Sequence, residues 1–141
     1  MEDFASATVR HWQTTDRLAS EGDWQQAAYL AGYIAECSLK SLLARTATTI
    51  LPKHVGHDLV RLVGDALELA WILTPATRRY PIPRISSGAP GIGEWRPEHR
   101  YARTGFLPEK RFKQIVSEAR DIGSSVLIGL VLDGVMEDLP L

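Results

Sequence analysis

The sequence predicts an all-α protein, an up-and-down bundle of four to five helices with a long Pro/Gly-rich loop before the last helix. Apolar residues recur at helical spacing in four separate segments of the chain. The segment from Ala28 to Leu43 is apolar almost all round, which is typical of a helix buried among other helices. Five of the eight prolines fall within residues 74–105, and such clusters mark loops. The last helical segment is therefore set apart from the others.

The first two predicted helices are antiparallel neighbours joined by a short break. The first spans residues 3–19, and four residues form its apolar stripe: Phe4, Val9, Trp12 and Leu18. Asp23 follows the break and is the predicted N-cap of a second helix over residues 24–46. The single cysteine, Cys37, lies in this second helix and excludes an internal disulfide. We expect it to be a small core residue, not a nucleophile.

A third helix is predicted over residues 57–72, where apolar positions keep the helical period. Residues 74–105 then form a loop of a length that is usually functional or disordered in compact domains. We expect its aromatic residues Tyr80, Trp95 and Tyr101 to pack parts of it against the bundle.

The last helix is predicted over residues 108–136, because Pro108 suits a first helical turn. Three glycines interrupt its apolar stripe: Gly123, Gly129 and Gly134. Each costs about 1 kcal/mol relative to alanine in a helix. They indicate either the close approach of another helix, including one across a dimer, or a kink or early end of this helix.

Size and composition indicate a single domain over residues 1–141. The chain is 45% hydrophobic, which is enough for a real core. Its net charge of −1 leaves no global basic field for nucleic acid, although a local patch can still bind it. The longest apolar run is far below the ~20 residues of a membrane span, and the N-terminus lacks a signal-peptide pattern. We therefore expect a cytoplasmic protein with no membrane contact.

A polar seam interrupts the apolar second helix. Glu36 and Lys40 are spaced i,i+4, which places them on one face of that helix. A buried charge without a partner is very costly, and His57 and Asp58 at the start of the third helix can supply further partners. The sequence thus predicts a structural polar network of four residues: Glu36, Lys40, His57 and Asp58. A direct ligand-binding or catalytic role for them is the alternative.

Arg100 is the strongest functional candidate. Its planar guanidinium can donate two parallel hydrogen bonds to a phosphate, and Tyr101 beside it can stack on a base. The predicted ligand- or phosphate-binding residues are Arg100, Arg96, Arg103, Tyr101 and Lys40. In the alternative, Arg100 pairs with Glu36 or Asp58 and Tyr101 packs in the core.

Two other patterns are weak. The glycine-rich stretch at Gly88, Gly91 and Gly93 neither follows a clear strand nor opens a helix, so it does not predict a dinucleotide site. His54 and His57 with Asp58 lack a further good ligand for zinc. We expect no cofactor and no metal.

The order of these features resembles the HEPN family of small helical-bundle domains. Four pieces carry the resemblance, in the order Trp24 with Ala28-Tyr29-Leu30-Ala31, then Glu36-Cys37-Ser38-Leu39-Lys40-Ser41-Leu42-Leu43, then Gly56-His57-Asp58-Leu59 with Leu62, and then Arg100-Tyr101. The resemblance implies a bundle of four or five helices that is commonly a homodimer. It also implies a role in defence, RNA processing or a toxin–antitoxin pair, where the partner is a nucleotidyltransferase or antitoxin.

Many HEPN proteins are RNases whose signature is an arginine followed, after four to six residues, by a histidine. No arginine of this chain is followed by a histidine at that spacing, and His99 stands before Arg100. We therefore predict a non-catalytic module that binds a nucleotide, RNA or a partner protein. One alternative is a divergent metal-independent RNase, in which Arg100 stabilises the phosphate and His99 or His57 is the general base. The other is a purely structural subunit.

Overall fold

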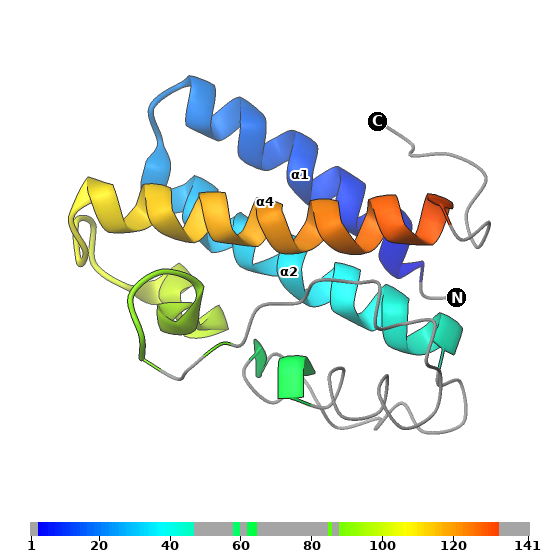
Figure 1. Ribbon diagram of the computed structural model, residues 1–141. Coiled ribbons are helices and arrows are strands. Elements are labelled where there is room, and N and C mark those ends of the chain that lie inside the picture. The colour runs from blue at the N-terminus through cyan, green and yellow to red at the C-terminus, as the bar shows by residue number, and fades with distance from the viewer. Residues whose placement is uncertain (1–2, 47–57, 60–61, 65–84, 86–87, 133–141) are drawn as a thin grey trace.

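The computed structural model describes residues 3–46, 58–59, 62–64, 85 and 88–132 (Figure 1). The elements are α1 (Phe4–Ser20), α2 (Trp24–Thr46), two short 3-10 helices η2 (Ile92–Glu94) and η3 (Pro97–Tyr101), and α4 (Glu109–Leu132). No strand occurs among these residues. The predicted all-α bundle is confirmed, and the observed bounds of α1 and α2 agree with the predicted ones to within one residue.

The connection between α1 and α2 is a tight turn built around one glycine. Gly22 has a φ of +81°, and its N–H donates to Ala19 O while Asp23 N–H donates to Leu18 O, at 3.0 and 2.9 Å. This is a Schellman motif, which satisfies the last carbonyls of a helix. Asp23 then begins α2, because its Oδ1 accepts from Gln26 N–H at 3.2 Å. The predicted N-cap is confirmed.

Helix α2 is the centre of the bundle. It packs along α1 on one side and α4 on the other, whereas α1 and α4 touch each other much less. Figure 1 shows α4 running in the direction of α2 and α1 running against both. This position explains why α2 is apolar almost all round, with Ile34 and Leu39 fully buried. Neither α2 nor any other helix in the described ranges is long and apolar enough to cross a membrane.

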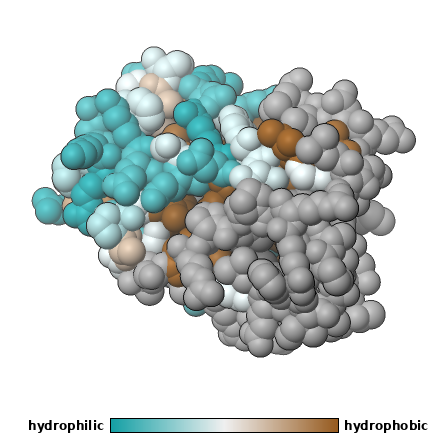
Figure 2. Space-filling model, in the orientation of Figure 1, coloured by the Kyte–Doolittle hydropathy of each residue, from teal (hydrophilic) through white to brown (hydrophobic). Residues whose placement is uncertain are grey.

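Helix α4 has one buried and one solvated face. Its inner face places Ile115, Ala119 and Ile122 in the core. Its exposed residues are polar, such as Lys113 and Asp121, with the exception of Ile128 near its C-terminal end. Figure 2 shows the resulting hydrophilic surface over the N-terminal half of α4. The amphipathic period predicted for the last helix is therefore confirmed.

Gly123 allows α4 to approach the other two helices closely. A Cβ atom at this position would lie 2.7 Å from Ile34 Cγ2 and 3.1 Å from Trp12 Cζ3. The helix continues without a break through Gly123 to Leu132. Close approach within the chain is thus the observed role of Gly123. Gly134 and the predicted end of the helix at residue 136 lie outside the described residues.

The third predicted helix is described only at its beginning. Leu59 and residues 62–64 are helical, and Leu62 N–H donates to Asp58 O at 2.9 Å, as in an α-helix. Leu59 and Val63 are buried in the common core. The remainder of this predicted helix lies outside the described residues.

Cys37 is buried, as predicted, and burial together with the nearby Glu36 charge raises the pKa of its thiol to about 11. The thiolate is the reactive form of cysteine, and a free cysteine has a pKa near 8.5. We therefore expect the folded protein to react with Ellman's reagent at pH 8 at least ~100-fold more slowly than the unfolded chain. Absorbance after mixing with and without denaturant measures this, and equal rates would contradict the described position of Cys37.

Candidate functional site

Trp95 anchors the loop before α4 to the middle of α2. Its side chain is 2% exposed, and its Nε1–H donates to the Tyr29 carbonyl at 2.9 Å. The indole occupies the space beside Gly32, where a Cβ atom would overlap the ring. The prediction that Trp95 packs against the bundle is confirmed. Its contact with Gly32 has no signal in the sequence, because a glycine inside an apolar helix has many possible reasons.

A second set of contacts anchors the same loop to α4. Ile92 N–H donates to Glu118 Oε2 at 2.8 Å. Glu94 accepts from Gly91 N–H at 3.0 Å and forms an ion pair with the Arg111 guanidinium, whose Nε lies 3.1 Å from Glu94 Oε2. The loop is thus bound to both α2 and α4. The start of η3, which follows the loop, is therefore held in place.

The glycine-rich stretch is a structural turn. Gly88 and Gly91 have φ angles of +75° and +90°, a region that favours glycine. Gly88 N–H donates to Gly93 O at 3.0 Å, and a Cβ atom on Gly91 would overlap the Glu118 carboxylate. These features explain Gly88 and Gly91 without a nucleotide phosphate, and Gly93 contributes the carbonyl that closes the turn.

Helix η3 presents a basic and aromatic surface. The side chain of Tyr101 is 78% exposed, and the described residues include only one other exposed large hydrophobic residue, Ile128. The guanidinium carbon of Arg100 lies 4.7 Å from the centroid of the Tyr101 ring, in a cation–π contact. Arg96, Arg100 and Arg103 are all exposed. Four of the five predicted ligand-binding residues are thus exposed in or beside η3, and two of them, Arg100 and Tyr101, are in contact.

The expectation that Tyr101 packs against the bundle is wrong. In a helix with three residues per turn, Tyr101 shares its face with Glu98, and both side chains are exposed. The next face carries His99, which is the side chain that packs inward. The alternative pairing of Arg100 with Glu36 or Asp58 is also not observed, since no described carboxylate forms an ion pair with Arg100.

Two further contacts hold η3 and the turn after it. The Arg96 guanidinium donates to the carbonyls of Gly93 and Trp95 at 3.1 and 2.7 Å. Gln25 of α2 donates to Arg103 O at 3.2 Å and accepts from Gly105 N–H at 2.8 Å. The Gln25 amide therefore fixes the backbone of Arg103 while the arginine side chain stays exposed. Sequence reasoning missed Gln25, because about 80 residues separate it from its partners and no local pattern links them.

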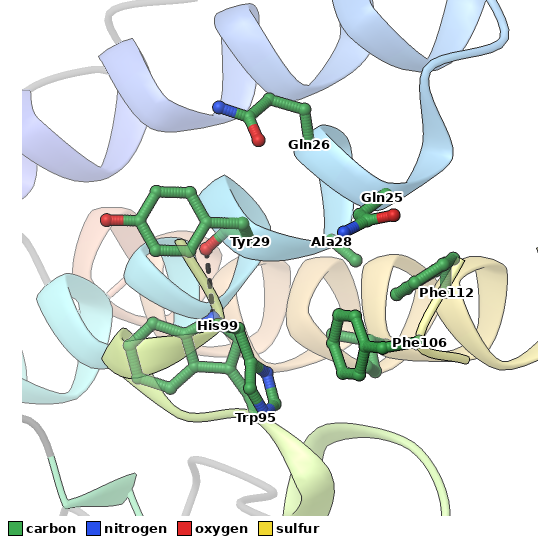
Figure 3. Close-up of a pocket in the computed structure, with 9 residues that line it drawn as sticks. Gln25, Gln26, Ala28, Tyr29, Trp95, His99, Phe106 and Phe112 are labelled. Carbon is green, nitrogen blue, oxygen red and sulfur yellow. Dashed lines mark hydrogen bonds between the residues drawn. The ribbon is translucent and has the colours of Figure 1, made fainter. Parts of the chain in front are cut away.

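His99 lies in a different environment from Arg100. It lines a small pocket with Tyr29, Trp95 and Phe106, wide enough for about one water molecule (Figure 3). Its ring centroid is 4.8 Å from that of Phe106, and its Nδ1 accepts from Arg96 N–H at 3.3 Å. Burial and then the Arg96 charge lower its pKa, so the imidazole is neutral near pH 7. The predicted catalytic residue His57 lies outside the described residues.

The polar seam is a buried ion pair. Glu36 is 3% exposed, and its Oε1 lies 2.8 Å from Lys40 Nζ. The Lys40 ammonium also lies 5.8 Å from the centroid of the Phe4 ring at the start of α1. Lys40 is thus engaged within the bundle and is not part of the η3 surface. Asp58 is exposed, and its predicted neighbour His57 is outside the described ranges.

The described residues hold no group of three or more histidine, cysteine or acidic side chains that could bind a metal ion. His54, like His57, lies outside them. In comparisons with known proteins, no family model, no characterised protein and no solved structure matches this chain.

Proposed function

We propose that this chain is a HEPN-like module that binds single-stranded RNA or a nucleotide through η3 and does not cleave it. The observation that carries the proposal is the exposed Arg100–Tyr101 pair on a short helix that is fixed to the bundle. The pair offers an aromatic face on which a base can stack and, beside it, a guanidinium that can bind a phosphate.

The chemistry of η3 suits both parts of a nucleotide. The Tyr101 ring can stack on a base, an interaction that contributes about 1–3 kcal/mol per base. The Arg100 guanidinium can take the adjacent phosphate with two hydrogen bonds. Residues 96–103 contain three arginines and one glutamate, so this segment has a net charge of +2 in a chain whose net charge is −1. The positive charge is therefore local, as expected for a small binding surface.

The anchoring of η3 favours binding because little ordering remains to be done when a ligand arrives. Trp95 holds the start of η3 against α2, and Gln25 holds the backbone that follows it. A surface that is ordered in advance loses less conformational entropy on binding.

The surroundings of His99 favour binding over cleavage. A general base must reach the proton that it removes, directly or through one water molecule. His99 Nδ1 already accepts a backbone N–H, and its ring packs on Phe106. Arg100 instead contacts Tyr101. Arg100 and His99, one of the two arginine–histidine pairs of the RNase alternative, therefore have separate neighbours, and the other histidine, His57, lies outside the described residues.

Binding of a labelled single-stranded oligonucleotide, followed by fluorescence anisotropy, tests this proposal. We expect Tyr101→Ala to weaken binding about tenfold, through the lost stacking. Arg100→Ala should also weaken it and reduce the slope of log K against log salt by about 0.7, the value for one phosphate contact on a single strand. Arg17→Ala is the matched control, because it removes one exposed arginine from α1 and should leave binding unchanged.

Two results would contradict the proposal. Equal losses in Arg17→Ala and Arg100→Ala would mean that binding reflects total charge and not η3. Cleavage of the RNA in the presence of a chelator, lost in Arg100→Ala, would instead favour the RNase alternative. Intact RNA after incubation is the expected result.

The same proposal includes a homodimer and an antitoxin or nucleotidyltransferase partner in a defence or toxin–antitoxin setting, since the HEPN resemblance implies both. Light scattering of the purified protein tests the first part. A mass twice the 15.7 kDa of one chain would support it, and a mass of one chain would remove the homodimer from the proposal.

A further inference from the structure

The Tyr101 ring on η3 has one covered face and one open face. The guanidinium carbon of Arg100 lies over the ring, 4.7 Å from its centroid. No other ring or cation among the described residues contacts Tyr101, and its side chain is 78% exposed. The second face of the ring is therefore available to a base that stacks on it.

Glu98 lies one turn before Tyr101 on the same face of η3. Both residues belong to the five-residue helix Pro97–Tyr101, and both side chains are exposed. In a 3-10 helix, residues three apart are eclipsed, with a rise of about 6 Å between them. A base that stacks on Tyr101 thus lies within reach of the Glu98 carboxylate.

The oxygens of the Glu98 carboxylate are available to a ligand. Within the described ranges they accept no hydrogen bond and form no ion pair. Two other glutamates near the loop differ in this respect. Glu94 accepts from Gly91 N–H at 3.0 Å and pairs with Arg111, and Glu118 accepts from Ile92 N–H at 2.8 Å. Their carboxylates hold the loop, whereas that of Glu98 does not.

A carboxylate beside a stacked base distinguishes bases by their donors, because an ionised carboxylate only accepts hydrogen bonds. Guanine has two adjacent donors on its Watson–Crick edge, N1–H and the N2 amino group, which can bind the two carboxylate oxygens in parallel, as an arginine does. Adenine and cytosine have one amino group beside a ring nitrogen that is an acceptor, and uracil has its N3–H between two carbonyls. In a single strand this edge is free to be recognised. Guanine is therefore the base that fits Glu98.

We propose that Glu98 makes the η3 surface selective for guanine, by accepting two hydrogen bonds from the base that stacks on Tyr101. This inference rests on the proposed function and makes its ligand more specific, namely a guanine nucleotide unit. Tyr101 and Arg100 supply affinity for any nucleotide, and Glu98 determines which base is preferred.

Competition between two RNA pentamers, UUGUU and UUAUU, tests this inference by fluorescence anisotropy with the full chain. Both strands carry one purine and the same number of phosphates, so stacking and charge are matched. We expect the wild type to bind UUGUU about tenfold more tightly, which is within the discrimination expected of one bidentate contact to a base. Glu98→Gln replaces one acceptor oxygen by a donor. It should weaken UUGUU binding and reduce the preference to about twofold or less.

The direction of the change separates base recognition from a general effect of charge. If Glu98 acts only through its negative charge, Glu98→Gln tightens the binding of both strands equally, and the inference is overturned. Glu21→Gln is the matched control, because it removes an exposed carboxylate at the end of α1. This control should leave the preference for UUGUU unchanged.

The remaining outcomes separate this inference from the proposed function. Equal binding of the two strands by the wild type, or a preference that persists in Glu98→Gln, overturns the guanine contact. The proposed function stands in either case if binding still depends on Arg100 and Tyr101. If the wild-type chain binds neither these pentamers nor a longer strand, both proposals fail together.

Discussion

Replacing Trp95 by alanine should lower the free energy of unfolding by about 3–5 kcal/mol, the usual range for a buried tryptophan. The substitution removes an almost fully buried ring from the core and leaves the space beside Gly32 empty. It also removes the hydrogen bond from the indole to Tyr29 O. Denaturant unfolding followed by circular dichroism at 222 nm measures the change. Because η3 is attached through this residue, the proposed RNA binding should weaken as well.

Two variants separate the parts of this contact. Trp95→Phe keeps an aromatic ring and loses the N–H donor, so we expect a smaller loss of about 1–3 kcal/mol. Gly32→Ala adds a methyl group where the indole lies. It should destabilise the protein by about 1–3 kcal/mol through overpacking, although alanine favours a helix by about 1 kcal/mol. A Gly32→Ala protein that is more stable than the wild type would contradict the described position of Trp95.

Removing Glu36 should be the second most damaging change, because it leaves the Lys40 ammonium without its partner. Breaking a buried ion pair typically costs 3–5 kcal/mol, and the 19% exposure of the Lys40 side chain reduces the expected loss to about 2–4 kcal/mol. Glu36→Ala is therefore expected to unfold at a clearly lower denaturant concentration than the wild type. Under conditions where the variant is fully folded, its affinity for RNA should equal that of the wild type.

The double variant Glu36→Leu/Lys40→Met is the informative companion. Replacing both members of a buried pair by apolar residues is often neutral or stabilising. We expect it to recover most of the stability that Glu36→Ala loses. If the double variant is stable and binds RNA normally, the seam is structural, as the sequence predicts. If it is stable and does not bind, the alternative role of Glu36 and Lys40 in ligand binding gains support.

The helices could be predicted because their signals are local. The Asp23 cap lies three residues from the N–H that it accepts, and the apolar period of α4 is visible within any two turns. The same holds for Glu36 and Lys40, which are one turn apart. Each of these signals lies within or directly beside the helix that it specifies. It can therefore be recognised from the sequence alone.

The candidate site could be predicted only in part. Arg100 and Tyr101 stand out as residue types, but the exposure of Tyr101 depends on the 3-10 geometry of η3, which five residues do not reveal in a sequence. The pair of Glu94 with Arg111 and the bonds of Gln25 join positions 17 and about 80 residues apart. Pairs so far apart produce no periodic pattern in the sequence. They therefore cannot be distinguished from the many other polar residues that could pair.

The difference in sequence separation also sets an order of assembly. The turn at Gly22 lets α1 and α2 meet across a connection of three residues, whereas Trp95 must reach Tyr29 across 66 residues. Closing a longer loop costs more entropy, and contacts near in sequence form faster. We expect the α1–α2 hairpin to form early, with late protection of the Ile92 and Gly105 amides from hydrogen exchange. A partly folded chain would then contain the α1–α2 hairpin but no η3 surface, so the proposed RNA binding would report completed folding.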